Sequence, residues 1–547
     1  MSYLDEIEQL KAIIAKQQLQ LQKQDETIAK HVNTIKKQEH QIEVMMQALL
    51  HARKKIFGKS SEVSKGFPGQ LSLFTTTNEL VQELMKQQTE IEVKPYTRTP
   101  RKAGVRAEML ASLPHEVEIC TIPTDDSCSI CGSKLKVIGK EVVRTEVEFI
   151  PSKVIVKQIV REVAKCVSCG TKESNNPKDH FQKAKTSPRI LSHSIATASL
   201  AANVMYQKFG LGVPFKRQES DYYRMGLVLP RNNMAHWTIR CSEDWFMPIY
   251  HRIHEKLLTC DTLHMDETRI QVNKEEGRSA SSQSFMWVMQ SGVAEKINAT
   301  FFHYTTSRST QEAIDLLTGF HGYLMTDAYV AYKKLENIKN SFCWSHCRRY
   351  FIESIPLDNK GKEIPGSKGA EGREHIKLLF KLEEKIKDLD YEEKKSKRQD
   401  ASRAILDAFW SWVDETAVIP TMNEKLTTAL NYAKNNRTYL ETFLEDGRLE
   451  ISNNRCEAHI KPFATARRAW LFADTPKGAT ANAVLYTLVE SAKANELNVY
   501  EYLKHLLSVM PALDFHNQPE LLDNLLPWSD QLPGECCLKQ IRKKCHK

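Results

Sequence analysis

The stretch "HMDETRIQV", residues 264–272, constrains the fold most, because it has the alternation of a buried strand yet carries acids in its middle. Met265, Ile270 and Val272 are side chains that a sheet buries, whereas Asp266 lies among them. A carboxylate that loses its water must pair, protonate or coordinate a metal ion. We therefore expect a sheet whose acid belongs to a polar or metal-binding site.

The chain that follows alternates between strand and helix patterns. Two more strands, a helix, a fourth strand and a fifth strand running into a helix are predicted, in this order, for "SFMWVMQS", "ATFFHYTT", "STQEAIDLLTGF", "GYLMTDAYVAY" and "SFCWSHCRRYF". This order is typical of a ribonuclease-H-like sheet, in which the first and fourth strands are neighbours. Since Asp327 falls where the fourth strand ends, Asp266 and Asp327 are expected to face each other across about one strand spacing.

Two carboxylates at that spacing repel each other unless cations lie between them. Oxygen ligands suit Mg²⁺ or Mn²⁺, and two such ions about 4 Å apart can activate an attacking oxygen and stabilise a departing one on phosphorus. The alternative is that Asp266 and Asp327 stand in unrelated turns or salt bridges.

A third acid, Glu457, falls on a predicted helix in "ISNNRCEAHIKPFATARRAWLF". Ser452, Asn453 or Asn454 would open this helix, because short polar side chains cap its first N–H groups. Two cations and an aromatic ring that would suit phosphates and an unstacked base follow on the same segment: Arg467, Arg468 and Trp470. A basic helix packed through one tryptophan is the alternative.

Two other residues compete for a place in the site. Glu267 follows Asp266 directly and should point to the opposite face of the strand, which makes it a poor ligand. His346, in "WSHC", could approach the site from the fifth strand or be a structural histidine.

Four cysteines form two CxxC pairs, each followed at once by glycine: Cys128, Cys131, Cys166 and Cys169. Two such hairpins can supply four sulfurs to a closed, tetrahedral and structural Zn²⁺ site, so residues 111–180 are predicted to be a small zinc-binding β module. Two redox-active pairs are the alternative.

Residues 186–255 have the period of three short helices with a glycine turn before the last, which resembles a helix-turn-helix unit. Four polar residues would then lie on the N-terminal part of the third helix, where a recognition helix meets DNA: Arg231, Asn232, Asn233 and His236. A three-helix unit that never contacts DNA is the alternative.

A seven-residue apolar step through residues 1–55 predicts a coiled-coil helix, although polar residues at the companion positions leave a solvated single helix as the alternative. Residues 56–110 are predicted to be a linker, and its basic stretch 98–106 could contact phosphate or simply be solvated. The last stretch, "GECCLKQIRKKCHK", has no ligand spacing and is expected to be a disordered end.

Composition sets broad limits on the class of protein. The net charge of +9 suits a polyanionic partner or a solubilising surface, and no apolar run is long enough to span a bilayer. Thirteen cysteines without a secretory leader fit reduced thiols, so we expect a cytoplasmic, nucleoid-associated protein with no membrane partner.

Several blocks in this order carry a specific resemblance: "LHMDET", "YLMTDAYVAY", "FCWSHCRRYF" and "SNNRCEAHIKPFATARRAWLF", behind the CxxC pairs and "PFKRQES". Together they resemble the insertion-sequence-66 family of DDE transposases over nearly the whole chain. The resemblance implies that the catalytic triad, which would hold two Mg²⁺ or Mn²⁺ ions, is Asp266, Asp327 and Glu457. Glu450 and Asp474 miss the register of the motif.

The family usually has Glu-Arg at the last acid, whereas this chain has Glu457-Ala458. Arg455, Lys461 or Arg467 would have to replace that phosphate contact. The family also carries an insertion before the last acid, and residues 355–445 fill that place with a helical pattern.

The predicted fold is thus multidomain α+β: coiled-coil helix, linker, zinc module and helical unit, then a ribonuclease-H-like α/β core over 260–354 and 446–515, interrupted by the helical insertion and followed by a tail over 516–547. The predicted function is a DNA transposase, a homodimer or higher oligomer, that cleaves element ends and joins them to target DNA. A DNA-binding regulator with a silent core and a nuclease that cuts without joining are the alternatives.

Overall fold

The computed structural model describes residues 117, 142, 153–165, 181–358 and 361–538. The predicted coiled coil (1–55), the linker (56–110) and all four predicted zinc ligands, Cys128, Cys131, Cys166 and Cys169, lie outside the described residues. The described chain groups into two compact units, of which the smaller comprises Cys347–Lys381 and Ala404–Asn435. Each unit is described by itself.

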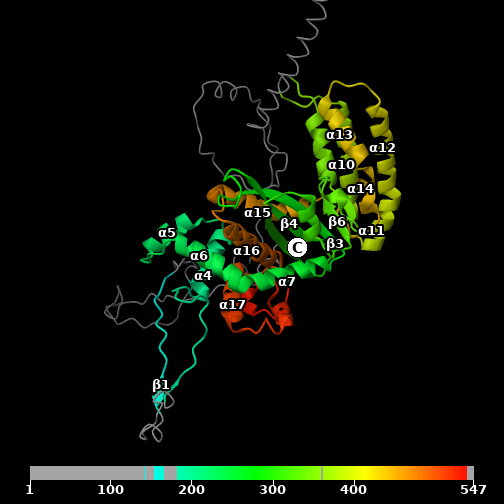
Figure 1. The fold of residues 1–547 in the computed structure, drawn as a ribbon. Helices are drawn as coiled ribbons and strands as arrows, with labels where there is room; N and C mark the ends of the chain where they lie inside the picture. The colour runs from blue at the N-terminus through cyan, green and yellow to red at the C-terminus, as the bar shows by residue number, and fades with distance from the viewer. Residues whose placement is uncertain (1–116, 118–141, 143–152, 166–180, 359–360, 539–547) are drawn as a thin grey trace, which may run out of the picture. The chain divides into compact units, whose positions relative to one another are not determined.

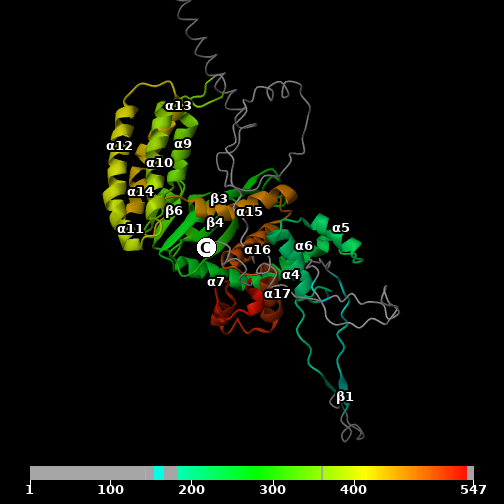
Figure 2. The same cartoon turned by 180° about the vertical axis from the view of Figure 1, so that it is seen from behind.

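A five-stranded sheet, in the order β5-β4-β3-β6-β7, forms the centre of the larger unit (Figures 1 and 2). Its strands are β3 (Thr262–Gln271), β4 (Gln283–Ser291), β5 (Thr300–Thr305), β6 (Tyr323–Thr326) and β7 (Lys339–Phe342). The first three are antiparallel, whereas β6 runs parallel to β3 and to β7. The prediction that the first and fourth strands of the sheet are neighbours is confirmed.

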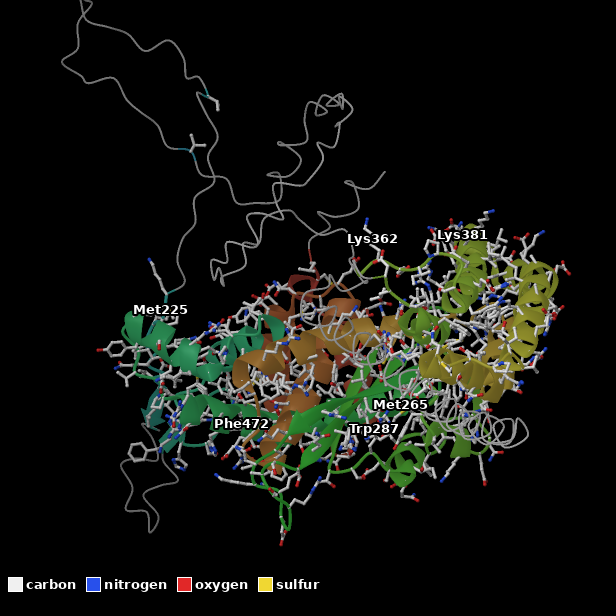
Figure 3. The ribbon with its side chains drawn as sticks, turned by 90° about the horizontal axis from the view of Figure 1, so that it is seen from above. Met225, Met265, Trp287, Lys362, Lys381 and Phe472 are labelled. Carbon is white, nitrogen blue, oxygen red and sulfur yellow. The ribbon has the colours of Figure 1, made fainter. Side chains whose placement is uncertain are left out.

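The register between β3 and β6 decides which residues meet. Their last pair is His264 with Met325, so Asp266 and Asp327 each lie two residues further along neighbouring parallel strands. Met265 and Trp287, on β3 and β4, are buried in the middle of the sheet (Figure 3). Asp266, in the middle of the longer strand β3, and Asp327, directly after β6, therefore lie at the same level of two adjacent strands.

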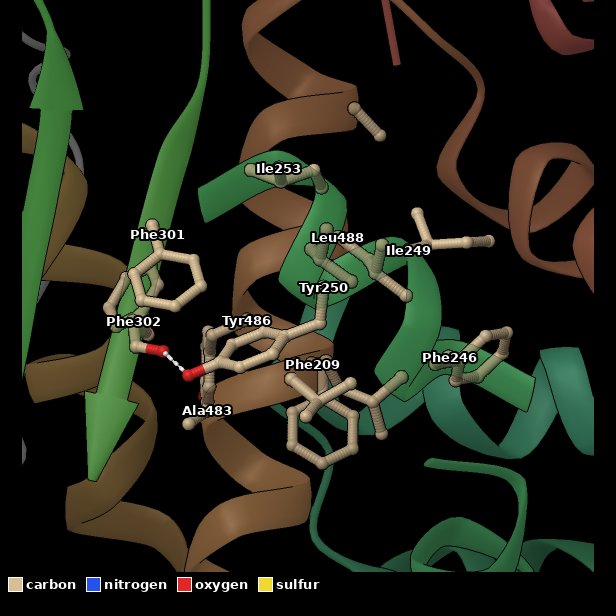
Figure 4. Packing of buried hydrophobic residues seen from close by; sticks show 14 of the residues in the cluster. Phe209, Phe246, Ile249, Tyr250, Ile253, Phe301, Phe302, Ala483, Tyr486 and Leu488 are labelled. Carbon is tan, nitrogen blue, oxygen red and sulfur yellow. Dashed lines mark hydrogen bonds between the residues drawn. The ribbon is translucent and has the colours of Figure 1, made fainter. Parts of the chain in front are cut away.

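Two helices, α7 (Met247–Leu258) and α16 (Pro476–Ala494), pack beside the edge strand β5 in an aromatic core (Figure 4). The Tyr250 ring stacks on Phe301 with centroids 4.4 Å apart, and its hydroxyl donates to Phe302 O at 3.0 Å. Small hydroxyl residues of α16 satisfy the edge of the sheet, because the backbone N–H groups of residues 300 and 302 donate to Ser491 and Thr487. A helix buried on nearly all sides thus covers this edge.

The predicted helical unit contains α4 (Ala198–Met205) with η3 (Tyr206–Gly210), α5 (Phe215–Arg224) and α6 (Arg231–Cys241). The chain turns between α5 and α6 through Gly226, whose φ of 87° suits glycine. Helix α6 begins directly after Pro230, as the sequence predicts. It continues through η4 (Ser242–Phe246) into α7.

The smaller unit is helical. It contains most of α9 (Trp344–Ser354), α10 (Lys368–Ile386) and α12 (Arg403–Ala417), and all of α13 (Glu424–Asn435). Phe351 packs against Phe409 and Trp412, and Gly372 lies so close to the Phe351 ring that a Cβ would clash. The predicted helical insertion does not coincide with this unit, because Leu382–Arg403 groups with the sheet.

The remaining elements of the described chain are β1 (Val163–Lys165), β2 (Phe181–Lys183), α8 (Thr310–Leu316), η5 (Tyr332–Lys334), α11 (Tyr391–Lys397), η6 (Arg398–Ser402), α14 (Arg437–Glu441), η7 (Thr442–Leu444), α15 (Asn454–Trp470), α17 (Val499–Val509), η8 (Met510–Ala512), η9 (Pro519–Leu525) and η10 (Gly534–Cys536). No helix in these described segments has the length and apolar character needed to cross a membrane.

The expectation of a disordered end is wrong for residues 534–538. Cys536 is buried, and its carbonyl accepts a hydrogen bond from Asn498 N at 2.7 Å. The backbone of Cys537 forms an isolated antiparallel β-bridge with that of Leu497. The tail is ordered here because it closes over the start of α17, which the absence of a ligand spacing could not reveal.

Candidate active site

The three predicted acids come from three different elements. Asp266 is on β3, Asp327 directly follows β6, and Glu457 lies on the first turn of α15. Burial first, and then the charges of Glu267, Asp327 and Glu457, raise the pKa of Asp266 to about 8, although a hydrogen bond from the Glu267 backbone N–H lowers it. The fold therefore brings the three predicted acids into mutual electrostatic contact.

Helix α15 is fastened to the sheet by Asn453, a fully buried side chain at the N-cap position. Its Nδ2 donates to Met265 O at 3.0 Å, its Oδ1 lies 3.1 Å from His264 Nδ1, and its backbone N–H donates to Cys343 Sγ at 3.1 Å. Its side chain makes no capping hydrogen bond, so the capping role expected from the sequence is wrong. The asparagine instead places Glu457, one turn later, beside Asp266.

A contact between the buried His264 and the half-buried Glu450 supports the same junction. His264 Nε2 lies 2.8 Å from Glu450 Oε2. Burial raises the pKa of Glu450, but the hydrogen bond and charge of His264 outweigh it and hold the pKa below its usual range. Both ring nitrogens of His264 thus face oxygen atoms, and Glu450, which misses the motif register, has a positioning role.

His346, at the start of α9, lies beside the last acid. Its Nε2 is 3.9 Å from Glu457 Oε1, a buried oxygen with no hydrogen-bond partner within the described chain. An orphaned buried carboxylate oxygen is costly unless something binds it. The interpretation of His346 as a residue near the site fits this placement.

Arg308, which the sequence did not mark, lies beside Asp327 and pairs with Glu267, which the sequence had given as a poor ligand. Arg308, in the loop before α8, forms an ion pair with Glu267 through Nη2, which also lies 3.8 Å from Asp327 Oδ2. Tyr332 donates its hydroxyl to Glu267 Oε2 at 2.6 Å. Nothing in "TTSRST" marks Arg308, because a lone arginine in a serine- and threonine-rich loop usually belongs to the surface.

The donor set suits a hard divalent cation, since it offers carboxylate oxygens from three elements and one orphaned oxygen. The pKa of Asp266 is raised first by burial and then by the neighbouring negative charges. As placed here, the described residues contain no group of three or more His, Cys, Asp or Glu side chains that could hold a metal ion. The acids are neighbours whose ligating geometry is not assembled.

The predicted DNA-contacting residues of α6 are all exposed to solvent. Arg231, Asn232, Asn233 and His236 are exposed, whereas Met234, Trp237 and Thr238 on the other side of the helix are buried. The Arg231 backbone N–H donates to Glu219 of α5 at 3.0 Å, which joins the two helices of the turn. The four polar side chains are thus displayed together.

The residues predicted around α15 divide into exposed and packed groups. Lys461 and Arg468 are exposed, and Arg467 is half-buried, with its pKa lowered by burial and by Arg468 and Arg269. Arg455 donates to Ser291 O at 3.1 Å and Asn298 Oδ1 at 2.8 Å. Internal partners therefore occupy two donors of Arg455.

Trp470 behaves as the packing alternative anticipated. Its ring meets Phe463 edge-on, with centroids 5.8 Å apart and planes at 74°, and Lys208 Nζ lies 5.6 Å from its centroid. The indole is half-buried and packs against the hydrophobic core of the larger unit. The role predicted for it in base stacking would require it to leave these contacts.

Comparison with known families is decisive. A family described as "Transposase IS66 family" matches residues 193–481, more than half of the chain and all of the site. The chain belongs to the IS66 transposase family. Three further matches have family descriptions: a "zinc-finger binding domain of transposase IS66" over 125–170, an "IS66 C-terminal element" over 487–528 and "Transposase C of IS166 homeodomain" over 45–117.

Similar chains occur in Sinorhizobium fredii. "Uncharacterized protein y4hP" is 25% identical over 503 residues, which cover 87% of this chain and 86% of that protein. "Uncharacterized protein y4jD" is 26% identical over 426 residues, which cover 74% of this chain and 78% of that protein. The family resemblance inferred from the sequence blocks is confirmed.

Among solved structures, a chain of the "Drosophila P element transposase strand transfer complex" aligns with 58% of this chain and 83% of its own length at 14% identity. The TM-score is 0.22, which is too low to carry an argument about fold or chemistry. Membership of the IS66 transposase family therefore rests on sequence.

Proposed function

We propose that this IS66 transposase binds the ends of its mobile element, hydrolyses phosphodiester bonds and joins the freed 3′ ends to target DNA. The proposal is supported by the placement of a buried acid, Asp266, within electrostatic reach of Asp327 and Glu457; burial first, and these charges with that of Glu267, raise the pKa of Asp266 to about 8. Carboxylates that lie close together on neighbouring elements are what a site for divalent cations needs. The strand order supports a ribonuclease-H-like core.

In this mechanism Asp266, Asp327 and Glu457 would hold the cations, with Asn453 fixing the approach of the helix that carries Glu457. When bound, two Mg²⁺ or Mn²⁺ ions would activate the attacking oxygen and stabilise the leaving oxygen of an in-line displacement. His346 would position Glu457. No covalent protein–DNA intermediate is needed, so one site can serve cleavage and joining.

The decisive experiment is a strand-transfer assay with pre-cut and uncut element ends. Asp266→Ala, Asp327→Ala or Glu457→Ala should each abolish cleavage and joining while end binding persists. Asp474→Ala is the matched control, because this acid of the last block is exposed and paired with Lys274 at 2.7 Å. Cleavage that survives in any of the three variants would refute the assignment.

The same assay separates the alternatives. A nuclease nicks the uncut ends but does not join them, and a DNA-binding regulator shows neither activity with wild-type protein. Protomer number, measured by light scattering on the full chain with bound ends, tests the proposed homodimer or higher oligomer.

DNA recognition is proposed for the exposed face of α6 and for a structural zinc module held by Cys128, Cys131, Cys166 and Cys169. Arg231→Ala or His236→Ala should weaken end binding about tenfold. Arg240→Ala is the control, because this exposed arginine of the same helix is already paired with Asp244 at 2.8 Å. Equal losses in all three variants would exclude specific contact, and zinc analysis of the full chain tests the four cysteines.

A further inference from the structure

An arginine borders the acidic site although DNA-cleavage chemistry at carboxylates does not require one. Arg308 Nη2 pairs with Glu267 Oε1 and lies 3.8 Å from Asp327 Oδ2. Its side chain is about one-third exposed, whereas the Glu267 side chain is almost completely buried. A cation is therefore placed between a buried acid and a predicted metal ligand.

Tyr329 contacts Arg308 at two places, its guanidinium group and its backbone carbonyl. Its guanidinium lies over the Tyr329 ring, 3.7 Å from the centroid, and its carbonyl accepts the Tyr329 hydroxyl at 2.6 Å. The Tyr329 backbone N–H in turn donates to Asp327 Oδ1 at 3.0 Å. The arginine and Asp327 are thus fastened to the same tyrosine, which ties the position of one to the other.

Glu267 is built as an anchor for this arginine. It neighbours Asp266 on β3, so its side chain leaves the opposite face of the strand. Its two oxygens are used by Arg308 and by Tyr332, which is itself completely buried. Both acceptor atoms have partners, and Glu267 has no oxygen directed to a shared metal site.

We propose that Arg308 is a positioning residue that serves as the built-in counter-ion of the acidic site, held by Glu267, and that it limits the affinity of the site for divalent cations. This inference rests on the proposed function. Without a cation between them, Asp327 and its neighbours repel each other, and the guanidinium stabilises their approach. Because like charges repel, the same guanidinium opposes the binding of Mg²⁺ or Mn²⁺.

Charge arithmetic predicts opposite effects for two substitutions. Glu267→Gln removes a negative charge and leaves Arg308 opposed only by Asp327, so metal binding should weaken about tenfold. Adding Arg308→Gln to that variant removes the positive charge and should restore affinity to near the wild-type value. A merely structural pair predicts two losses that accumulate.

The experiment is calorimetric titration of the full chain with MnCl₂ in the absence of DNA. It compares wild type, E267Q, E267Q/R308Q and E267Q/R308K, with circular dichroism as the check of folding. The lysine variant is the matched control, because it keeps the charge and should stay as weak as E267Q. If E267Q does not fold, R308Q alone is measured, and it should bind Mn²⁺ at least as tightly as wild type.

The outcomes separate this inference from the proposed function. If wild type binds Mn²⁺ but E267Q/R308Q is no tighter than E267Q, or R308Q alone is weaker than wild type, the counter-ion role is wrong and the triad stands. If wild type binds no Mn²⁺, the metal-dependent function itself fails. Recovery in E267Q/R308Q but not in E267Q/R308K supports the inference.

Discussion

The larger unit contains two charged clusters, one around Arg398 and one around the three acids, that differ in how completely their charges are paired. At Arg398, which is completely buried, Nε and Nη2 form a two-pronged pair with Glu383 at 2.9 and 2.7 Å. The remaining N–H groups donate to the carbonyls of Phe443, Asp446 and Leu449 at 2.8–2.9 Å. All five donors of this arginine have acceptors.

At the acidic site the balance is the reverse. Arg308 lies beside Glu267 and Asp327, and His346 lies 3.9 Å from Glu457, whereas the buried Asp266 has three acids as its charged neighbours. One carboxylate oxygen has no hydrogen-bond partner among the described residues. The Arg398 cluster stabilises the fold as it stands, whereas the acidic site is set up for a ligand.

The largest effect is expected for a substitution in the Arg398 cluster, in which every N–H donor has an acceptor. Arg398→Ala should lower the free energy of unfolding by about 3–5 kcal/mol, because it leaves Glu383 and three carbonyls buried without donors. Urea denaturation measures the loss. Lys339→Ala is the control, since its pair with Glu445 at 3.1 Å is exposed and its loss should leave the free energy of unfolding nearly unchanged. Equal losses would remove the distinction between buried and exposed pairs.

The next substitution is expected to raise the free energy of unfolding, not to lower it. Because the pKa of Asp266 is raised to about 8, the folded protein binds more protons than the unfolded chain between about pH 4 and 8, so its stability falls as pH rises through that window. Asp266→Asn removes the contribution of Asp266 to this fall and should be about 2–3 kcal/mol more stable than wild type at pH 9, with little difference at pH 4.

Thermal melts of both proteins in EDTA across pH 4–9 test this gain. Asp474→Asn is the control, because that exposed acid should leave the pH dependence unchanged. A D266N variant less stable than wild type at pH 9 would show that the acidic site is self-satisfied like the Arg398 cluster.

A third prediction concerns the junction that keeps the acids close. Asn453→Ala should destabilise the protein by about 1–2 kcal/mol, since Met265 O and His264 lose a buried partner. It should also reduce DNA cleavage more than Asn454→Ala does. Asn454 is the matched control, an exposed asparagine in the next position. Equal cleavage by the two variants would show that Asn453 does not position Glu457.

How far the sequence reaches can be judged from the elements that make the site. Alternation and spacing predict the strands, the adjacency of β3 and β6, and hence the proximity of Asp266 and Asp327, because these depend on period and chain order. The placement of α6 after Pro230 follows from local stereochemistry. All these features are encoded over short distances.

What the sequence could not supply depends on partners far apart in the chain. The Asn453–Met265 hydrogen bond spans 188 residues, and Arg308 reaches Glu267 from a loop without a pattern. Trp470 has a sequence context that suits nucleic acid but a position that packs. Whether such a side chain packs in the core or is available for function depends on neighbours that are distant in the sequence.

The smallest effect is expected at Lys208. This lysine differs from both clusters, because its ammonium group lies over aromatic rings and, within the described chain, not beside a carboxylate. Its Nζ is 4.3 Å from the Phe215 centroid and 5.0 Å from that of Phe209, and burial lowers its pKa to about 8. Since the unfolded chain binds more protons between about pH 8 and 10.5, wild-type stability should rise with pH there.

Lys208→Met keeps the apolar stem and removes the charge, so it should be about 1 kcal/mol more stable than wild type at pH 7, an advantage that shrinks by pH 10. Lys216→Met, at an exposed lysine of α5, is the control and should show no such trend. If Lys208→Met is instead less stable at pH 7, the attraction between ammonium and rings exceeds the cost of losing water. Lys208 would then belong with Arg398 among the charges that stabilise the fold.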